Sequence, residues 1–245
     1  QWAMCGPPRP EGRFHLYAVE GGTAAMCYIF KSMKTNRLLN AGDTIALATP
    51  TFTPYLEMPH LEDYDLKIVS VQMRQESRFQ FDDAELKKLL DPAIKAFFVV
   101  NPGNPSAVAL SEQTITKIGA ILKKRPELIL LTDDVYGTFV PGFRSLLGAY
   151  PHNTIGVYSY SKYFGCTGWR LGTIALQEDN IIDEMLAAQN RLFGADLQQS
   201  VGEPEEESGE DNPEADHHHR ARARVLEVER AGPEEDGKHG DDQCR

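Results

Sequence analysis

The segment TIGVYSYSKYFGCTGWR, residues 154–170, is the most informative part of the chain for its fold. Its first six residues, Thr154 to Ser159, are rich in β-branched and other apolar side chains, as expected of a strand with both faces covered. Lys162 follows just beyond this strand, and Arg170 lies eight residues further along. In an open α/β sheet, ligands bind at the loops that follow the carboxyl ends of the strands. The segment therefore predicts a buried strand of an α/β domain that carries part of a binding site.

Segments of similar composition recur along the chain and predict further strands. We expect these strands at Ile45–Thr49, Lys67–Gln72, Ile94–Val100, Leu128–Thr132 and Leu171–Leu176. Helical spacing predicts helices at about residues 23–39 and 180–193, and a third that starts after the N-cap residue Ser111 and stops before Pro126. Such an alternation is typical of an α/β domain with a mostly parallel sheet flanked by helices.

Charge divides the chain into a nearly neutral body and an acidic end. The net charge is −11, but residues 201–245 hold 15 acidic and 6 basic side chains, which leaves residues 1–200 at −2. A body without a basic face is not expected to bind nucleic acid. Residues 197–245 have few large aliphatic side chains, so we expect them to form a disordered charged tail. The three adjacent histidines at 217–219 are expected to be incidental, and no metal site is predicted.

The four cysteines lie far apart, at positions 5, 27, 166 and 244. Their spacing fits neither a metal site nor a dense disulfide framework, so we expect free thiols in a reducing compartment. The sequence shows no apolar run of about 18 residues that could span a bilayer, and no secretory leader pattern. These features predict a cytoplasmic protein without a membrane partner.

Side chains that together suit one cofactor follow several of the predicted strands. Pyridoxal 5′-phosphate (PLP) needs a lysine for its aldehyde, an acid beside its pyridine nitrogen, donors for its phenolate oxygen, a stacking aromatic ring and a phosphate cup. The chain offers candidates for all five requirements, which are, in chain order, Gly22, Thr23, Phe52, Asn104, Asp133, Tyr136, Ser159, Lys162 and Arg170. Their order along the chain makes the case, because each one alone is a weak signal.

The phosphate cup and the acid have a direct physical basis. Gly22 and Thr23 precede an apolar helix, and a helix N-terminus favours an anion. Ser159 and Arg170 would complete the cup with a hydroxyl and a guanidinium fork. Asp133, at the carboxyl end of a predicted strand, could keep the pyridine nitrogen protonated, which makes the ring an electron sink.

Each of these features also has a simpler explanation. The glycine pair fits an ordinary turn, Phe52 fits a core aromatic residue, Asn104 fits an Asn-Pro turn, and Asp133 fits a surface residue that caps a turn.

The spacing of Ser159 and Lys162 also fits the Ser-x-x-Lys of penicillin-recognising acyl enzymes. Neither Ser-Asp-Asn nor Lys-Thr-Gly follows it, which argues against that class.

Five longer strings carry a resemblance to a known family. They are GRFHLYAVEGGTAAMCYIF from Gly12, TPTFTPYLEMP from Thr49, VVNPGNPSAVALS from Val99, LTDDVYGTFV from Leu131 and VYSYSKYFGCTGWRLG from Val157. On these strings the chain resembles the aspartate aminotransferase superfamily of fold type I PLP enzymes over most of residues 12–193. It resembles most closely the bacterial L-aspartate 4-decarboxylases (aspartate β-decarboxylases), which also transaminate aspartate.

The resemblance implies a role for each candidate residue. Lys162 forms the internal aldimine with PLP and, once released, moves the Cα proton of the substrate. The other eight hold the cofactor: Asp133 pairs with the pyridine nitrogen, Asn104 and Tyr136 hydrogen-bond the phenolate oxygen, Phe52 stacks on the ring, and Gly22, Thr23, Ser159 and Arg170 hold the phosphate. A homo-oligomer is also implied, with L-aspartate as the small-molecule substrate.

The resemblance implies a division of the chain into a partial N-terminal segment at 1–13, a PLP-binding large domain at 14–196 and the charged tail at 197–245. The tail stands where the small C-terminal domain of the family is expected, and that domain supplies the arginine for the substrate α-carboxylate. Two functions follow as expectations. One is the conversion of L-aspartate to L-alanine and CO2 with aspartate aminotransferase activity, and the other is a cofactor-binding fragment without turnover.

Overall fold

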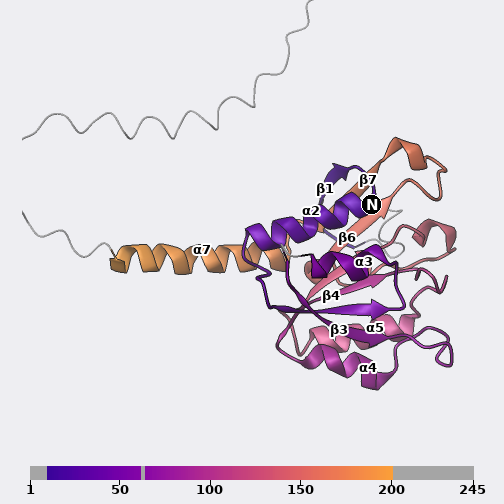
Figure 1. Ribbon diagram of the computed structural model, residues 1–245, viewed down its shortest axis with the longest axis horizontal. Coiled ribbons are helices and arrows are strands. Elements are labelled where there is room, and N and C mark those ends of the chain that lie inside the picture. Colours follow the sequence, from indigo (N-terminus) through magenta and orange to yellow (C-terminus); the bar gives the residue numbers. More distant parts are fainter. Residues whose placement is uncertain (1–9, 62–63, 201–245) are drawn as a thin grey trace, which may run out of the picture. The chain divides into compact units, whose positions relative to one another are not determined.

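The computed structural model describes residues 10–61 and 64–200, the last nine of them by their backbone only. The described residues form a seven-stranded sheet with the order β1-β7-β6-β5-β4-β2-β3 (Figure 1). Its strands are β1 (Phe14–Val19), β2 (Thr44–Thr49), β3 (Lys67–Gln72), β4 (Ile94–Val100), β5 (Ile129–Asp133), β6 (Thr154–Ser159) and β7 (Gly172–Gln177). The mostly parallel sheet predicted from the sequence is confirmed.

The carboxyl ends of nearly all the strands lie at the same edge of the sheet. Strands β3, β2, β4, β5 and β6 are parallel neighbours. Strand β7 runs antiparallel to both β6 and β1, so β1 points the same way as the parallel strands. The carboxyl ends of six strands and the amino end of β7 therefore lie at one edge.

Among the described strands, β1 is the one that was not predicted from the sequence. Four of its six residues are exposed, including Leu16 and Tyr17 at 53% and 52%. It lies at the end of the sheet and pairs only with β7 among the described strands. A strand without a buried face lacks the apolar alternation by which strands are recognised in a sequence.

The helices lie between the strands in chain order. They are α2 (Gly22–Thr35), α3 (Pro54–Glu57), η1 (Met58–His60), α4 (Asp83–Lys87), η2 (Lys88–Leu90), α5 (Glu112–Leu122), η3 (Gly137–Phe139), α6 (Leu146–Ala149), η4 (Pro151–Asn153), η5 (Thr167–Trp169) and α7 (Ile181–Ser200). As predicted, Ser111 caps α5, because its Oγ accepts from the Thr114 amide at 3.2 Å. Helix α2 ends before the predicted residue 39, since Arg37 adopts a left-handed φ of 57°.

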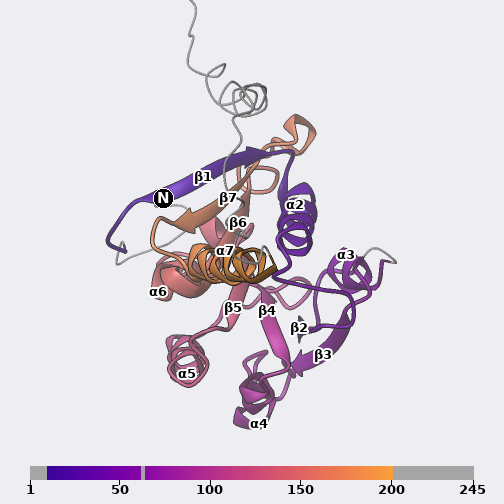
Figure 2. The same ribbon diagram turned by 90° about the vertical axis from the view of Figure 1, so that its left-hand side faces the viewer.

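Two apolar cores cover the two faces of the sheet, which gives a three-layer structure. On one face, Met26, Ile29 and Phe30 of α2 pack against alternate residues of the central strands. On the other face, Ile115 and Ile118 of α5 pack with residues of α4 and α6. Figure 2 shows α2 and α3 on one side of the strands and α4 and α5 on the other. The central strands are mostly apolar because both of their faces are buried.

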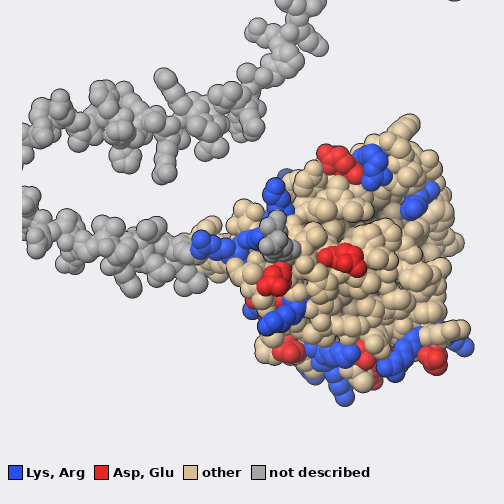
Figure 3. All heavy atoms as spheres, viewed as in Figure 1, with Lys and Arg blue, Asp and Glu red and all other residues tan. Residues whose placement is uncertain are grey.

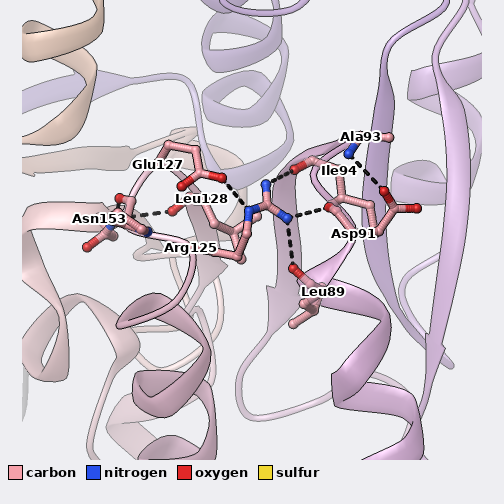
Figure 4. A network of polar contacts seen from close by, with 9 residues as sticks. Leu89, Asp91, Ala93, Ile94, Arg125, Glu127, Leu128 and Asn153 are labelled. Carbon is pink, nitrogen blue, oxygen red and sulfur yellow. Dashed lines mark hydrogen bonds and ion pairs between the residues drawn. The ribbon is translucent and has the colours of Figure 1, made fainter.

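A buried arginine ties the ends of the elements at the other edge of the sheet (Figure 4). Arg125, just after α5, has a side chain that is only 7% exposed and pairs with Glu127. Its guanidinium donates to the backbone oxygens of Leu89 at 3.0 Å, of Ile94 at 2.8 Å and of Asp91. The charge is thereby surrounded by oxygen acceptors, which offsets the cost of burying it.

Basic and acidic side chains alternate on the surface over α4 and α5. The ammonium groups of Lys117 and Lys88 each lie 2.6 Å from a carboxylate oxygen, of Asp83 and Glu85 respectively. Figure 3 shows Lys, Arg, Asp and Glu side chains intermingled along the lower margin of the molecule. Much of the central surface in this view is uncharged. Within the described residues, no helix has the length and hydropathy needed to cross a membrane.

Parts of the predicted division of the chain fall outside what the structure describes. This holds for residues 1–9 of the predicted N-terminal segment and for 201–245 of the predicted disordered tail, including the histidines at 217–219. Helix α7 extends to Ser200, seven residues beyond the predicted end at Phe193. The proposed boundaries at residues 13 and 196 stay predictions.

Candidate functional site

The candidate residues gather at the sheet edge where the carboxyl ends of the strands meet. Gly22 and Thr23 follow β1, Asn104 follows β4, and Lys162 follows β6. Arg170 reaches the same edge from the other direction, because it precedes the antiparallel strand β7. Loops at this edge are the usual ligand-binding positions in open α/β sheets.

A cavity of about 180 Å³ lies at this edge, and all nine predicted site residues line it. They come from five separate parts of the sequence and include Phe52, which follows β2, and Tyr136, which follows β5. Five further residues line the same cavity, namely Tyr55, Val100, Val135, Ser161 and Thr167. The fold thus brings the predicted residues together in one place.

Asp133 is a buried acid in the cavity wall. Its Oδ2 accepts a 2.5 Å hydrogen bond from the Tyr55 hydroxyl, and its Oδ1 accepts from the Val135 amide at 3.1 Å. Burial raises the pKa of the Asp133 carboxyl, while the bonds from Tyr55 and Val135 act in the opposite direction. Burial also raises the pKa of the Tyr55 hydroxyl, with the neighbouring Asp133 adding to the shift, so this tyrosine keeps its proton. A cation placed opposite Asp133 would stabilise its charged form.

Arg170 lies at the cationic end of the cavity and is held in place by backbone and hydroxyl oxygens. Its guanidinium donates to Ser161 Oγ at 3.3 Å and to the backbone oxygens of Thr167 and Glu20, both at 3.0 Å. The Ser159 and Ser161 hydroxyls, 3.0 Å apart, stand beside it. Several neutral donors and one permanent cation therefore converge where an anion would bind.

The glycine turn at this end permits a close approach of three segments. A Cβ on Gly21, which has φ 93°, would lie 2.3 Å from Arg170 Nη2. A Cβ on Gly172 would lie 2.8 Å from the backbone of Gly21. Because a side chain at either position would displace the turn or the guanidinium, both glycines are needed for the observed arrangement.

Lys162 reaches the cavity from a surface loop surrounded by aromatic rings. Its side chain is exposed, and the loop also carries Tyr163 and Phe164, which are 52% and 56% exposed. Their rings are 5.3 Å apart, and the ring of Phe139 lies 5.2 Å from that of Tyr163. The lysine amine thus shares a cavity with Asp133 while its loop remains open to solvent.

Three polar residues of the cavity wall were missed from the sequence, namely Tyr55, Ser161 and Thr167. Tyr55 lies three residues after Phe52, at the start of α3, and Ser161 lies two residues after Ser159. Alternation at a strand end places Ser159 and Ser161 on the same side, and this pattern could have indicated Ser161. No local signal indicated Tyr55, because its partner Asp133 is 78 residues away in sequence.

The chain is similar to aminotransferases in both sequence and fold. The family model for aminotransferase class I and II matches residues 19–225. A bifunctional aspartate aminotransferase and L-aspartate beta-decarboxylase of a Pseudomonas species is 51% identical over 185 residues. That match covers 75% of this chain but only 35% of the relative, so the chain spans about a third of the relative's length.

Solved structures share the fold described above. An alanine aminotransferase of Pyrococcus furiosus superposes with a TM-score of 0.61 at 26% identity, over 74% of this chain and 45% of that one. A PLP-dependent aminotransferase of Streptococcus suis, at 21% identity, gives a TM-score of 0.59 over 73% of this chain and 45% of that one. Because the family model matches most of the sequence, the chain belongs to the aminotransferase class I and II family.

Proposed function

We propose that this chain binds PLP and forms the cofactor-binding part of an enzyme that converts L-aspartate to L-alanine and CO2, with aspartate aminotransferase activity. One observation carries the proposal. A single cavity is lined by a lysine, a buried aspartate and a cup of hydroxyls with an arginine, all supplied by strand ends, a helix start and loops at one edge of the sheet. This set of groups matches what PLP asks of a protein.

The residues of the cavity fit the two ends of PLP. The N-terminus of the 14-residue helix α2, with Gly22 and Thr23, suits a phosphate group together with Ser159 and Arg170. The Gly21–Gly172 contact leaves no room for a Cβ there, so the backbone itself forms part of this cup. At the other end, the buried Asp133 carboxylate suits a protonated ring nitrogen, which would offset the cost of its burial.

The remaining candidates have roles that follow from their chemistry. When bound, PLP supplies an electron sink that stabilises negative charge on the substrate carbon next to the amino group. Lys162 holds the cofactor through its amine and, once free, takes and returns the proton at that carbon. Asn104 and Tyr136 would hold the ring through hydrogen bonds to its phenolate oxygen, and Phe52 would stack on the ring.

The proposed substrate and reaction rest on the relatives. The Pseudomonas protein is named for both aspartate transamination and aspartate β-decarboxylation. The two reactions need the same proton transfer at Cα, and they differ in whether the side-chain carboxylate then leaves. One lysine can therefore serve both.

A homo-oligomer in the cytoplasm is the proposed setting of the chain. Phe139, Tyr163 and Phe164 are each more than half exposed beside the cavity, and exposed aromatic clusters are typical of protein interfaces. Cys27 and Cys166 are free thiols, as expected in a reducing compartment. Sedimentation of the chain with and without PLP tests the assembly.

The function is tested by incubating the chain with PLP and L-aspartate and measuring alanine and CO2, with 2-oxoglutarate added in a second reaction to detect transamination. Turnover that Lys162→Ala abolishes supports the proposal. A second candidate, a PLP-binding fragment without turnover, is favoured by the 35% coverage of the Pseudomonas relative. It predicts a bound cofactor spectrum without alanine. A chain that binds no PLP would contradict both.

A further inference from the structure

Asp134 is a second buried carboxyl that the proposed function does not use. Its side chain is fully buried, next in sequence to Asp133. Successive residues of an extended strand point to opposite faces of the sheet. Accordingly, Asp133 contacts Tyr55 of α3 on the cavity side, whereas Asp134 contacts Ser145, the N-cap residue of α6, on the opposite side.

The contacts of Asp134 join three elements at the end of β5. Its carboxyl oxygens contact the hydroxyls of Thr132, at 2.6 Å, and of Ser145. Ser145 Oγ in turn accepts from the Leu147 amide at 2.9 Å at the start of α6. The backbone amide of Asp134 donates to the Val157 oxygen of β6 at 2.9 Å. Asp134 thus fixes the strand end that carries Asp133.

The surroundings of Asp134 favour a neutral carboxyl group. Within the described residues, no lysine, arginine or histidine forms an ion pair with it, and its polar side-chain partners are two hydroxyls. The neighbouring Asp133 is a titratable group that acts on Asp134 through its charge, and a charge on Asp133 disfavours a second one on Asp134. Burial raises the pKa of Asp134 to about 8, with Asp133 adding to the shift and the bonds from Ser145 and Thr132 opposing it.

We propose that Asp134 is a positioning residue for Asp133, and that it acts as a neutral acid which fixes the end of β5 and leaves the negative charge at this point to Asp133. This inference rests on the proposed PLP site. It explains why two adjacent buried carboxyl groups are tolerated at one strand end. The Thr132 and Ser145 hydroxyls both donate to the Asp134 oxygens, so the carboxyl group joins these two residues without a counter-ion.

The test compares Asp134→Ala and Asp134→Asn in the full chain. The alanine variant leaves the Thr132 and Ser145 hydroxyls without their buried partner, and we expect it to weaken PLP binding about tenfold or more. Asparagine is neutral and of the same shape, so it is expected to restore most of that loss. The asparagine variant is also expected to have a bound-cofactor absorption spectrum with the pH dependence of wild type. A group with a merely structural role would not affect that pH dependence. Thermal unfolding of the cofactor-free variants shows whether each one is folded.

Infrared spectroscopy of the cofactor-free chain supplies an independent readout. We expect wild type at pH 6 to show the carbonyl band of a protonated carboxyl group that Asp134→Asn removes. The proposal is overturned if the carbonyl band is the same in Asp134→Asn as in wild type. It is also overturned if Asp134→Asn shifts the pH profile of the cofactor spectrum, or if Asp134→Ala binds PLP as well as wild type. A wild-type chain that binds no PLP overturns the proposed function and the role toward Asp133 together. The infrared band then still reports whether Asp134 holds the proton.

Discussion

Replacing Arg125 by methionine is expected to destabilise the domain more than any change at the surrounding surface. The Arg125 side chain is 7% exposed, and its guanidinium donates to two buried backbone oxygens, of Leu89 and of Ile94 (Figure 4). Methionine has a similar length but no donor. The two carbonyl groups would therefore remain buried without a partner, because the elements around them are packed in the second apolar core.

The magnitude follows from these contacts. A hydrogen bond to a charged group contributes about 1.5–3 kcal/mol, so two of them give about 3–6 kcal/mol. The apolar methionine side chain is more favourable to bury and stabilises the folded state by about 1 kcal/mol. The free energy of unfolding is therefore expected to fall by about 2–5 kcal/mol. Urea unfolding at equilibrium measures this loss, provided that the slope against urea is unchanged.

A matched control separates the backbone contacts from the ion pair. Glu127 also contacts Arg125, but its side chain is 51% exposed. Glu127→Gln is therefore expected to cost less than about 1 kcal/mol. A free energy of unfolding for Arg125→Met within about 1 kcal/mol of wild type would show that the backbone contacts contribute little. A Glu127→Gln variant that loses as much stability as Arg125→Met would show that the ion pair matters instead.

Three further predictions concern the site. Tyr55→Phe removes the hydrogen-bond donor to Asp133, so the pKa of the Asp133 carboxyl should rise further. We expect PLP binding to weaken about tenfold in an absorbance titration, and an unchanged affinity would argue against the contact. Gly172→Ala places a Cβ 2.8 Å from the Gly21 backbone and should weaken PLP binding about tenfold, whereas Gly168→Ala, with open space around it, should not. The folded state holds the Asp134 proton up to a pKa of about 8, against an ordinary value of 3.8, so wild-type stability should fall as pH rises from about 4 to about 8. Asp134→Asn should show a shallower decline in urea midpoints over that range, and equal slopes would contradict the assignment.

The central strands were predictable because their composition is uniform along their length. Strands β4 and β6 have the predicted bounds, since each is rich in β-branched or apolar residues and ends at a polar turn. The edge strand β3 also has its predicted bounds. Strand β1 was not predictable in this way. Its pairing depends on β7, about 160 residues later in the chain, and its exposed side chains leave no local pattern.

The position of the site was also predictable in outline, because each candidate follows or precedes a strand at one edge of the sheet. The contacts inside it were not. Tyr55 meets Asp133 only because α3 folds back over the sheet, and Gly21 meets Gly172 only because β7 runs antiparallel. Such contacts depend on the packing of distant segments, which local sequence patterns do not contain.

The central claim is that the amine of Lys162 holds the aldehyde of PLP. The most direct measurement loads the full chain with PLP, reduces it with borohydride so that the bond between cofactor and lysine becomes permanent, and locates the label by peptide mapping. We expect a single labelled residue, Lys162, and no label in Lys162→Arg prepared in the same way. A label on another lysine, or retained labelling in Lys162→Arg, would contradict it.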